Sequence, residues 1–309
     1  MEYNSNVNNS NIITREYFDS LLIEMRHIDA VLPNTTFEIF GETFATPITT
    51  TALSHLNNHH PQGMVELARG VKAANTLMFA GMGDEAELEA IISTGAKVIK
   101  IIKTYADNDI IFRKIAHAEA KGCLAVGMDF DHAYNGLGEY DVIDGMKMSG
   151  KTLDELKLFV SATKLPFIVK GVLSVTDAKK CLEAGVQGIV VSHHAGIMSC
   201  AVPPLMVLPS IVKAILQENA TTEHNKQMKI FVDCGVQNGY DAFKALALGA
   251  DAVSVGRALL PSLTATGASG VSDTIQEFTS QLAGVMARTA SSNLSKIDSS
   301  YIWRRGSYE

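Results

Sequence analysis

The sequence predicts an α/β protein folded as a (β/α)8 barrel of the TIM type, with a short helix and hairpin before it. Eight apolar, strand-like runs recur along the chain, with helical patterns between or after them. This alternation is typical of a parallel sheet. Eight such pairs in roughly 250 residues match the size of a barrel. No Gly-rich fingerprint follows the first run, which disfavours the alternative of an open, doubly wound sheet.

Each element follows from local periodicity and punctuation. The eight strand-like runs begin near Pro47, Thr76, Lys97, Cys123, Pro166, Gly188, Lys229 and Asp251. Helical spacing covers Met64–Ala74, Glu85–Ser93, Ile110–Lys121, Leu153–Thr163, Val175–Ala184, Leu205–Gln217, Tyr240–Leu248 and Ile275–Ala287. Before the barrel, we expect a helix over Tyr17–Met25 and a hairpin over Thr35–Phe44, where residues alternate around a Gly-Glu turn.

Length and composition indicate one large domain. The chain has 309 residues, 47% of them hydrophobic, so we expect a single domain over residues 14–309 after an Asn/Ser-rich, disordered tail of residues 1–13. A net charge of −7 and a pI near 5.7 argue against nucleic acid or an anionic membrane surface as a partner. No run approaches the ~18–20 apolar residues of a membrane span, and no signal pattern is seen. We therefore expect a cytoplasmic protein.

The cysteines indicate neither a metal site nor a disulfide framework. Cys123, Cys181, Cys200 and Cys234 form no CxxC motif, and all but Cys200 lie in or beside apolar segments. They are expected to be buried, free thiols of a reducing compartment.

The stretch Pro166–Gly196 reads as strand, helix and strand, and two reactive side chains end its strands. Parallel strands place the chemistry of α/β proteins at their C-terminal ends. Lys170 ends the fifth strand and points into a mouth that should hold a cofactor or substrate, whose negative charge it could meet. The alternative is a plain salt bridge within the protein. His194 ends the sixth strand, where a histidine can act as a general base or serve a structural role. Asp131, after the fourth strand, is its candidate carboxylate partner.

The neighbouring His193 should point to the opposite face from His194, so we expect no metal site formed by the two histidines. Loops seven and eight of a barrel commonly bind phosphate. Here they read Asp233-Cys234-Gly235 and Gly256-Arg257, in which glycines let backbone N–H groups approach an anion and the arginine adds charge. The alternative is that these glycines only turn corners.

Taken together, these residues resemble the FMN-dependent 2-hydroxy acid oxidases and dehydrogenases, such as glycolate and lactate oxidase. The resemblance covers about Thr35 to Ile297 and is strongest in IVKGVLSVTDAKKCLEAGVQGIVVSHHAG and VDCGVQNGYDAFKALALGADAVSVGRALL. It implies FMN at the mouth of the barrel. Lys170 then contacts the N1/O2 edge of the flavin, and His194, oriented by Asp131, is the base while the substrate carbon gives a hydride equivalent to N5. The implied cofactor site comprises Thr51, Ala52, Ala80, Gly81, Lys170, Asp233, Gly235, Gln237, Gly256 and Arg257.

Departures from the family pattern fall on the substrate side. An arginine that holds the substrate carboxylate is replaced by Ile197, and the loop 132–151 contains no arginine. The arginine expected in the strand-seven loop is Gln237. Lys103 and Asp129 replace other family residues on strands three and four. Lys103 then either supplies a new cation to the substrate or pairs with Asp129, its neighbour across the strands.

The sequence thus predicts an FMN-dependent oxidoreductase acting on a 2-hydroxy acid or a related small hydroxy compound, in a pocket lacking both usual carboxylate-binding arginines. Lys103, Asp129 and His194 are its candidate substrate residues. The alternatives are an FMN-dependent reductase, a redox-neutral isomerase like the isopentenyl diphosphate isomerases, or a barrel that binds flavin or phosphate without catalysis. The resemblance also implies a homo-oligomer, a tetramer or octamer.

Overall fold

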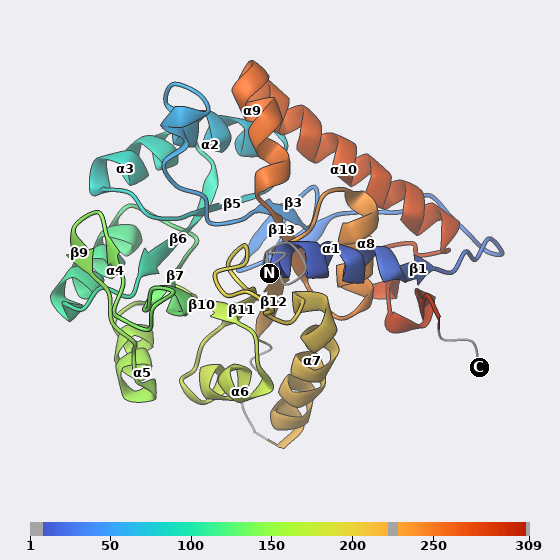
Figure 1. Ribbon diagram of the computed structural model, residues 1–309. Helices are drawn as coiled ribbons and strands as arrows, with labels where there is room; N and C mark the ends of the chain where they lie inside the picture. Colours follow the sequence, from blue (N-terminus) through green and yellow to red (C-terminus); the bar gives the residue numbers. More distant parts are fainter. Residues whose placement is uncertain (1–8, 222–227, 307–309) are drawn as a thin grey trace, which may run out of the picture.

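The computed structural model, which describes residues 9–221 and 228–306, contains the predicted barrel (Figure 1). Its eight parallel strands are β4 (Ile48–Thr50), β5 (Leu77–Ala80), β6 (Lys97–Lys103), β7 (Ala125–Asp129), β10 (Phe167–Val172), β11 (Gly188–Val191), β12 (Lys229–Val232) and β13 (Ala252–Val255). They hydrogen-bond in the order β4-β13-β12-β11-β10-β7-β6-β5. A parallel bridge between Leu53 and Ala80 joins the two ends, so the sheet closes on itself.

Helices follow the strands and surround the barrel, as predicted (Figure 1). They are α2 (Gly63–Ala73), α3 (Glu85–Ser93), α4 (Asn108–Ala120), α5 (Leu153–Ser161), α6 (Val175–Glu183), α7 (Pro204–Thr221), α8 (Gly239–Ala247), α9 (Leu260–Thr266) and α10 (Ala268–Arg288). Side chains cap the starts of α3, α4, α5, α6 and α8. For example, the Thr152 and Glu155 side chains form a reciprocal capping box at the start of α5.

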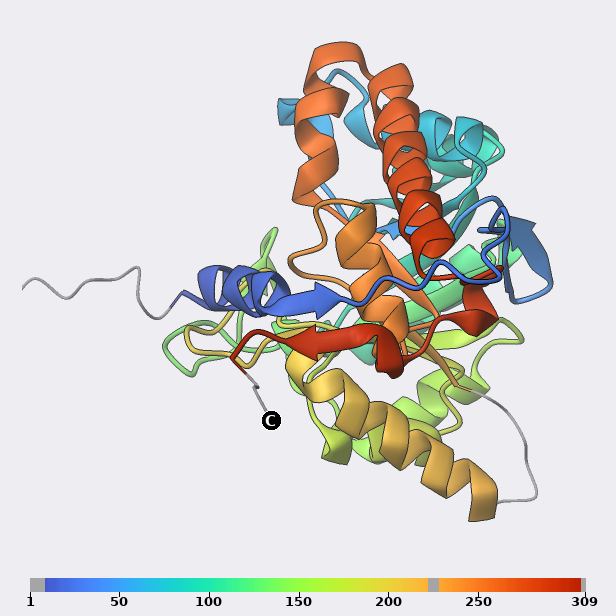
Figure 2. The same cartoon turned by 90° about the vertical axis from the view of Figure 1, so that its right-hand side faces the viewer.

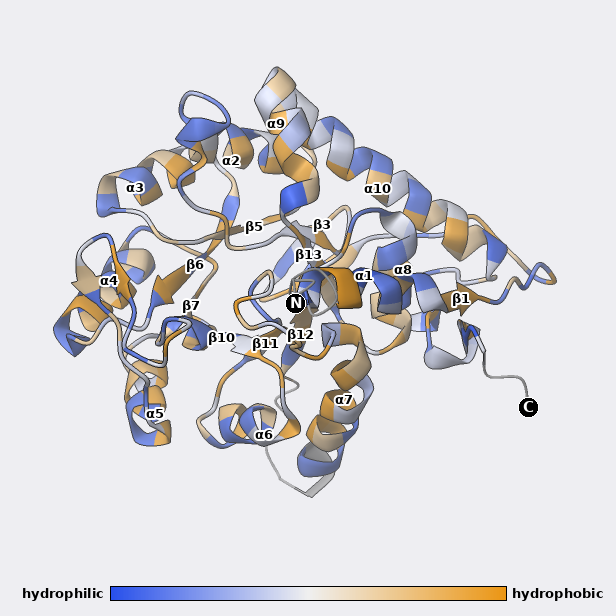
Figure 3. Cartoon of the chain, viewed as in Figure 1, coloured by the Kyte–Doolittle hydropathy of each residue, from blue (hydrophilic) through white to orange (hydrophobic). Residues whose placement is uncertain are grey.

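Two apolar clusters divide the core. One lies between the strands and the helices, and the other fills the barrel interior with side chains from alternate strand positions. In the hydropathy colours of Figure 3, strands β5 and β6 appear mostly in the orange of hydrophobic residues. Inside the barrel, the rings of Phe79 and Phe231 meet edge to face with 5.0 Å between centroids. Phe37 and Phe44 of the hairpin β2 (Phe37–Ile39) and β3 (Glu42–Phe44) belong to the same interior cluster. The predicted hairpin is therefore confirmed, and it contributes to the barrel core.

The segment before the hairpin differs from the prediction. Helix α1 spans Ser10–Ser20, and the chain then becomes strand β1 (Leu21–Ile23), where the sequence pattern had predicted continued helix to Met25. β1 pairs antiparallel with β14 (Ile302–Arg304), at the other end of the chain (Figure 2). This partner is more than 270 residues away in sequence, so local periodicity could not reveal it. Residues 10–13 are helical and not a tail, whereas residues 1–8 of the expected tail lie outside the described part.

The four cysteines are free thiols, but their burial differs from the expectation. Cys123 and Cys181 are buried, Cys234 is intermediate and Cys200 is exposed. Burial raises the pKa of the Cys123 thiol to about 11.

Two short hairpin strands, β8 (Val142–Ile143) and β9 (Met146–Lys147), lie in the long loop after β7. None of the helices in the described residues is long and apolar enough to cross a membrane.

Replacing Phe231 with alanine should lower the free energy of unfolding by about 3–5 kcal/mol, because the barrel interior cannot fill the space left by a buried ring. Chemical denaturation measures the change. Y240A is the matched control, since Tyr240 on α8 is 53% exposed and its loss should change stability by less than about 1 kcal/mol. Equal effects of the two substitutions would contradict the packing described here.

Candidate active site

Polar side chains line the C-terminal ends of the barrel strands. Ile101, Ile168 and Phe231 belong to the barrel interior, and side chains two positions further along a strand point the same way. Lys103, Lys170 and Asp233 therefore face the interior at the mouth. The same alternation adds Thr51, Gly81, Asp129 and Ser192 to this layer, which is referred to below as the strand-end layer.

Asp129 is the centre of the strand-end layer. Its side chain is 4% exposed; one carboxylate oxygen lies 2.6 Å from Lys103 Nζ and the other 3.0 Å from Lys170 Nζ. Burial opposes the charge on Asp129, but Lys170, His194 and Lys103 outweigh it and hold the pKa of this carboxyl well below its usual value. The structure thus forms the Lys103–Asp129 pair, the alternative to a free Lys103 cation.

Lys170 is buried among carboxylates. Burial by itself lowers the pKa of a lysine, but Asp129, Asp233 and Asp131 together raise the pKa of Lys170 above its usual value. Asp233 lies 4.0 Å from Lys170 Nζ and accepts a hydrogen bond from Thr51 Oγ1 at 2.9 Å. Lys170 therefore keeps its charge in the barrel mouth.

His194 and Asp131 come together as predicted from their places on the strands. His194 Nδ1 lies 2.8 Å from Asp131 Oδ1, 3.4 Å from Asp129 Oδ1 and 3.2 Å from Lys170 Nζ. Burial lowers the pKa of His194, but hydrogen bonds to Asp129 and Asp131 outweigh it and raise the pKa to about 9. The imidazole is thus held by Nδ1, with its side chain 25% exposed at the mouth.

Gly171 is a site residue that the sequence analysis did not single out. The β10–β11 register shifts between Lys170 and Val172, and Gly171 has φ +92°. A Cβ at this position would lie 2.5 Å from Asp131 Oδ2. Only glycine can therefore adopt this backbone conformation and leave room for the Asp131 carboxylate. A glycine within an otherwise apolar strand was the available signal.

His193 points away from His194, as predicted, and contacts helix α1. Its Nε2 lies 2.8 Å from Thr14 Oγ1, and its Nδ1 accepts a hydrogen bond from the Gly196 N–H at 2.9 Å. Burial lowers the pKa of His193. Asn11 of α1 donates to the Ala195 carbonyl at 2.7 Å. Helix α1 thus braces the loop after β11, which carries His194, a role that local sequence did not indicate.

The predicted anion site lies at the ends of β12 and β13. Asn11 Oδ1 accepts a hydrogen bond from Arg257 Nη2 at 2.6 Å. The backbone N–H groups of Gly235 and Gly256 donate to no described residue. Gln237 is exposed, and its backbone N–H donates to Asp241. Of the other predicted cofactor residues, Gly81 is buried beside the Ala52 carbonyl, while the Ala80 methyl packs in the outer apolar cluster.

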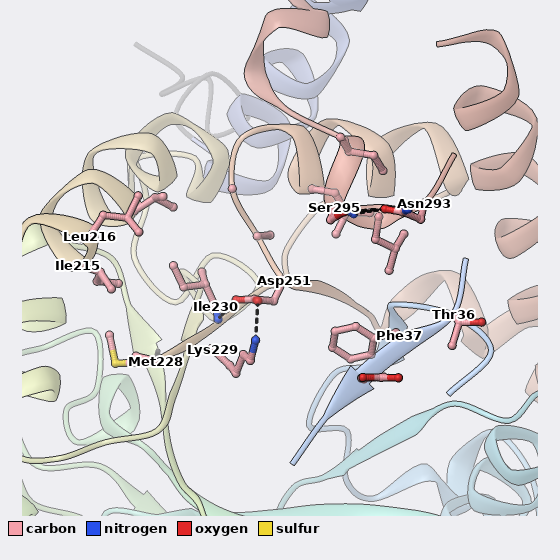
Figure 4. A pocket seen from close by; sticks show the side chains of 17 residues that line it. Thr36, Phe37, Ile215, Leu216, Met228, Lys229, Ile230, Asp251, Asn293 and Ser295 are labelled. Carbon is pink, nitrogen blue, oxygen red and sulfur yellow. Dashed lines mark hydrogen bonds and ion pairs between the residues drawn. The ribbon is translucent and has the colours of Figure 1, made fainter. Parts of the chain in front are cut away.

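A cavity of about 650 Å³ lies elsewhere, at the N-terminal end of the strands (Figure 4). Lys229 and Asp251 form an ion pair of 3.1 Å in its wall, among apolar side chains such as Ile215 and Met228. None of the polar groups of the strand-end layer borders this cavity. The chemistry therefore concentrates at the opposite end of the barrel.

Comparisons with known proteins point to one family. A family model described as FMN-dependent dehydrogenase matches residues 4–153 and 143–304. Glycolate oxidase 3 of Arabidopsis thaliana is 29% identical, and glycolate oxidase of Spinacia oleracea is 28% identical. Each alignment covers 95% of this chain and 86% of the relative.

Solved structures give the same result. A mandelate oxidase variant with the monooxide FMN adduct superposes with a TM-score of 0.84 at 26% identity, over 94% of this chain and 90% of that chain. Mandelate oxidase with (S)-2-phenylpropionate gives 0.83 at 25% identity, over 94% and 89%. Since the family model spans nearly the whole chain, the protein belongs to the FMN-dependent dehydrogenase family of CH–OH oxidoreductases, with FMN as its cofactor.

Proposed function

We propose that this protein oxidises the CH–OH carbon of a 2-hydroxy acid or a related small hydroxy compound, with His194 as the base. The observation that carries the proposal is the contact of His194 with Asp131 beside the buried Lys170. The pocket lacks the two arginines that the resemblance leads one to expect, since Ile197 occupies one position and the loop 132–151 has none. The names of the relatives, glycolate oxidase and mandelate oxidase, support a hydroxy acid type of substrate.

The residues present fit FMN. Arg257 and the N–H groups of Gly235 and Gly256, which donate to no residue in the described part of the chain, would hold its phosphate. Lys170, buried and charged, would supply a cation beside the flavin ring. Bound FMN would supply the electron acceptor for the oxidation.

The chain's own residues manage the proton. Neutral His194 takes the hydroxyl proton of the substrate at Nε2, because Nδ1 is engaged by Asp131. Asp131 then stabilises the imidazolium, as in other His–carboxylate pairs. Lys170 and Lys103 keep Asp129 charged, and Asp129 adds a second carboxylate near His194 Nδ1. The two carboxylates in the mouth of the barrel therefore stabilise the protonated imidazole of His194 that this proton transfer forms.

We further propose a cytoplasmic location and a homo-oligomer, a tetramer or octamer. The resemblance to the hydroxy acid oxidases supports the oligomer. Light scattering of the purified protein measures the mass of the assembly.

The visible spectrum of the purified protein, supplemented with FMN, tests the proposal first. Flavin bands should appear, and anaerobic addition of a hydroxy compound that is a substrate should bleach them. A protein that stays colourless with excess FMN would not be an FMN oxidoreductase. Bleaching by NAD(P)H and by no hydroxy compound would instead favour the reductase alternative.

Replacing His194 with glutamine should lower the rate constant of flavin reduction by about 10²–10⁴-fold, since that is the usual contribution of a general base. Stopped-flow absorbance measures the rate. FMN affinity should change little, which separates loss of the base from loss of the cofactor. H27Q, at an exposed loop position, is the control. An unchanged rate in H194Q would refute the assignment of the base.

The pH profile should follow the titration of His194. Its folded pKa of about 9 lies above the usual value, so the neutral base is scarce at pH 7. kcat/KM should rise about tenfold per pH unit and level off near pH 9. D131N removes one carboxylate that raises this pKa, so its plateau should begin at lower pH. Conversely, the stability contributed by protonated His194 should be lost as pH rises from about 6.5 to 9.

Replacing Gly171 with alanine should lower the flavin reduction rate at least tenfold, because the new Cβ displaces the Asp131 carboxylate. G122A is the matched control: Gly122 also has positive φ, at +79°, but a Cβ there meets nothing within 4 Å. Both variants should lose comparable stability from backbone strain. Equal activity loss in the two would show that strain, and not Asp131, is responsible.

A further inference from the structure

The strand-end layer, taken together with His194 and Asp131, contains no spare positive charge. In the described part of the chain, the three cations of this set are Lys103, Lys170 and His194, and its three carboxylates are Asp129, Asp131 and Asp233. Lys103 and Lys170 face Asp129 at 2.6 and 3.0 Å, and His194 faces Asp131 at 2.8 Å. A carboxylate bound here would therefore lack a free cation, and burying an unpaired charge is strongly unfavourable.

The lysines of the loop after β7 are engaged elsewhere. Lys151 donates to Asn108 and Ser149 at 2.7 and 3.0 Å, and Lys147 lies 5.0 Å from the centre of the Tyr140 ring. Arg257 belongs to the cofactor phosphate in the function proposed above. Because the loop 132–151 contains no arginine, it also supplies no guanidinium to a substrate carboxylate.

The same loop instead supplies a second imidazole. His132 meets His194 edge to face, with 4.8 Å between ring centroids, and its side chain is 24% exposed. Its Nδ1 lies 3.0 Å from Asp141 Oδ2, but the angle at this contact is not that of a hydrogen bond. The nearby carboxylate favours the proton on Nδ1, which leaves Nε2 as a lone-pair acceptor. Burial, Lys103 and His194 lower the pKa of His132, which favours the neutral ring.

We propose that the substrate is an uncharged hydroxy compound with an N–H or O–H donor beside the reacting carbon, as in a 2-hydroxy amide, and that His132 accepts a hydrogen bond from that donor. This inference rests on the function proposed above and narrows its substrate class. A neutral donor avoids the unpaired charge of a carboxylate. It also finds in His132 an acceptor that a carboxylate, which only accepts hydrogen bonds, could not use.

Matched substrates test this inference. FMN-loaded protein is mixed anaerobically with a 2-hydroxy amide, its methyl ester analogue and the free 2-hydroxy acid, each with a methyl or a phenyl side chain. The second-order rate constant of flavin reduction should be at least tenfold higher for the amide than for the acid, with the ester in between. An acid that reacts as fast as the amide overturns the inference and leaves the proposed function standing. An FMN-loaded protein that none of these compounds reduces contradicts both.

Two variants of His132 isolate its role. H132R supplies the missing cation, so the amide-to-acid ratio should fall at least tenfold. H132F removes the acceptor, so KM for the amide should rise to that for the ester while the ester reacts as before. H27R, which places arginine at an exposed loop position, should leave every ratio unchanged, and the flavin spectrum confirms that each variant is folded. An unaltered ratio in H132R, or a uniform loss for amide and ester in H132F, contradicts substrate contact by His132.

Discussion

The buried carboxylate of Asp129 is the constraint on which the mouth of this barrel depends. A charge with 4% of its side chain exposed must be paired, and Asp129 is paired on both oxygens, with Lys103 on one side and Lys170 on the other. The two lysines come from the strands on either side of β7. The ion pairs therefore tie three neighbouring strands together at the point where the chemistry is placed. They also leave Lys170 charged and positioned beside His194.

His194 takes its orientation from two sides. Asp131 holds Nδ1 from the β7 side, and it can do so only because the bulge at Gly171 leaves room for its carboxylate. From the other side, helix α1 holds the loop in which His194 and Ala195 adopt left-handed backbone conformations, at φ +49° and +55°. Such conformations are unfavourable for residues with a Cβ. The contacts of Asn11 and Thr14 with this loop offset that strain, so a terminal helix contributes to the site.

The sequence predicted most of the framework because barrel elements are local. The periodicity of hydrophobic residues in a strand or helix reflects how many of its faces are buried. The residue that ends each strand can be identified from the point at which its apolar run stops. Lys170, His194 and Asp131 were identified in this way. The alternation of side chains along a strand also predicted that His193 and His194 point in opposite directions. The prediction for Tyr17–Met25 was wrong because strand β1 exists only through its pairing with β14. An apolar segment that pairs with a distant strand looks locally like an amphipathic helix.

The amino-acid sequence by itself determined the strand–helix alternation, the barrel, the polar groups at the strand ends and the resemblance to a flavin-dependent family. Tertiary structure decided how the charges combine. It paired Lys103 with Asp129 where the sequence left two readings, placed His132 against His194, and brought α1 over the loops of β11 and β12. The physical reason is that periodicity reports which face of an element is buried. Electrostatic partners are set by distances between elements far apart in the chain, and these appear only when the barrel closes.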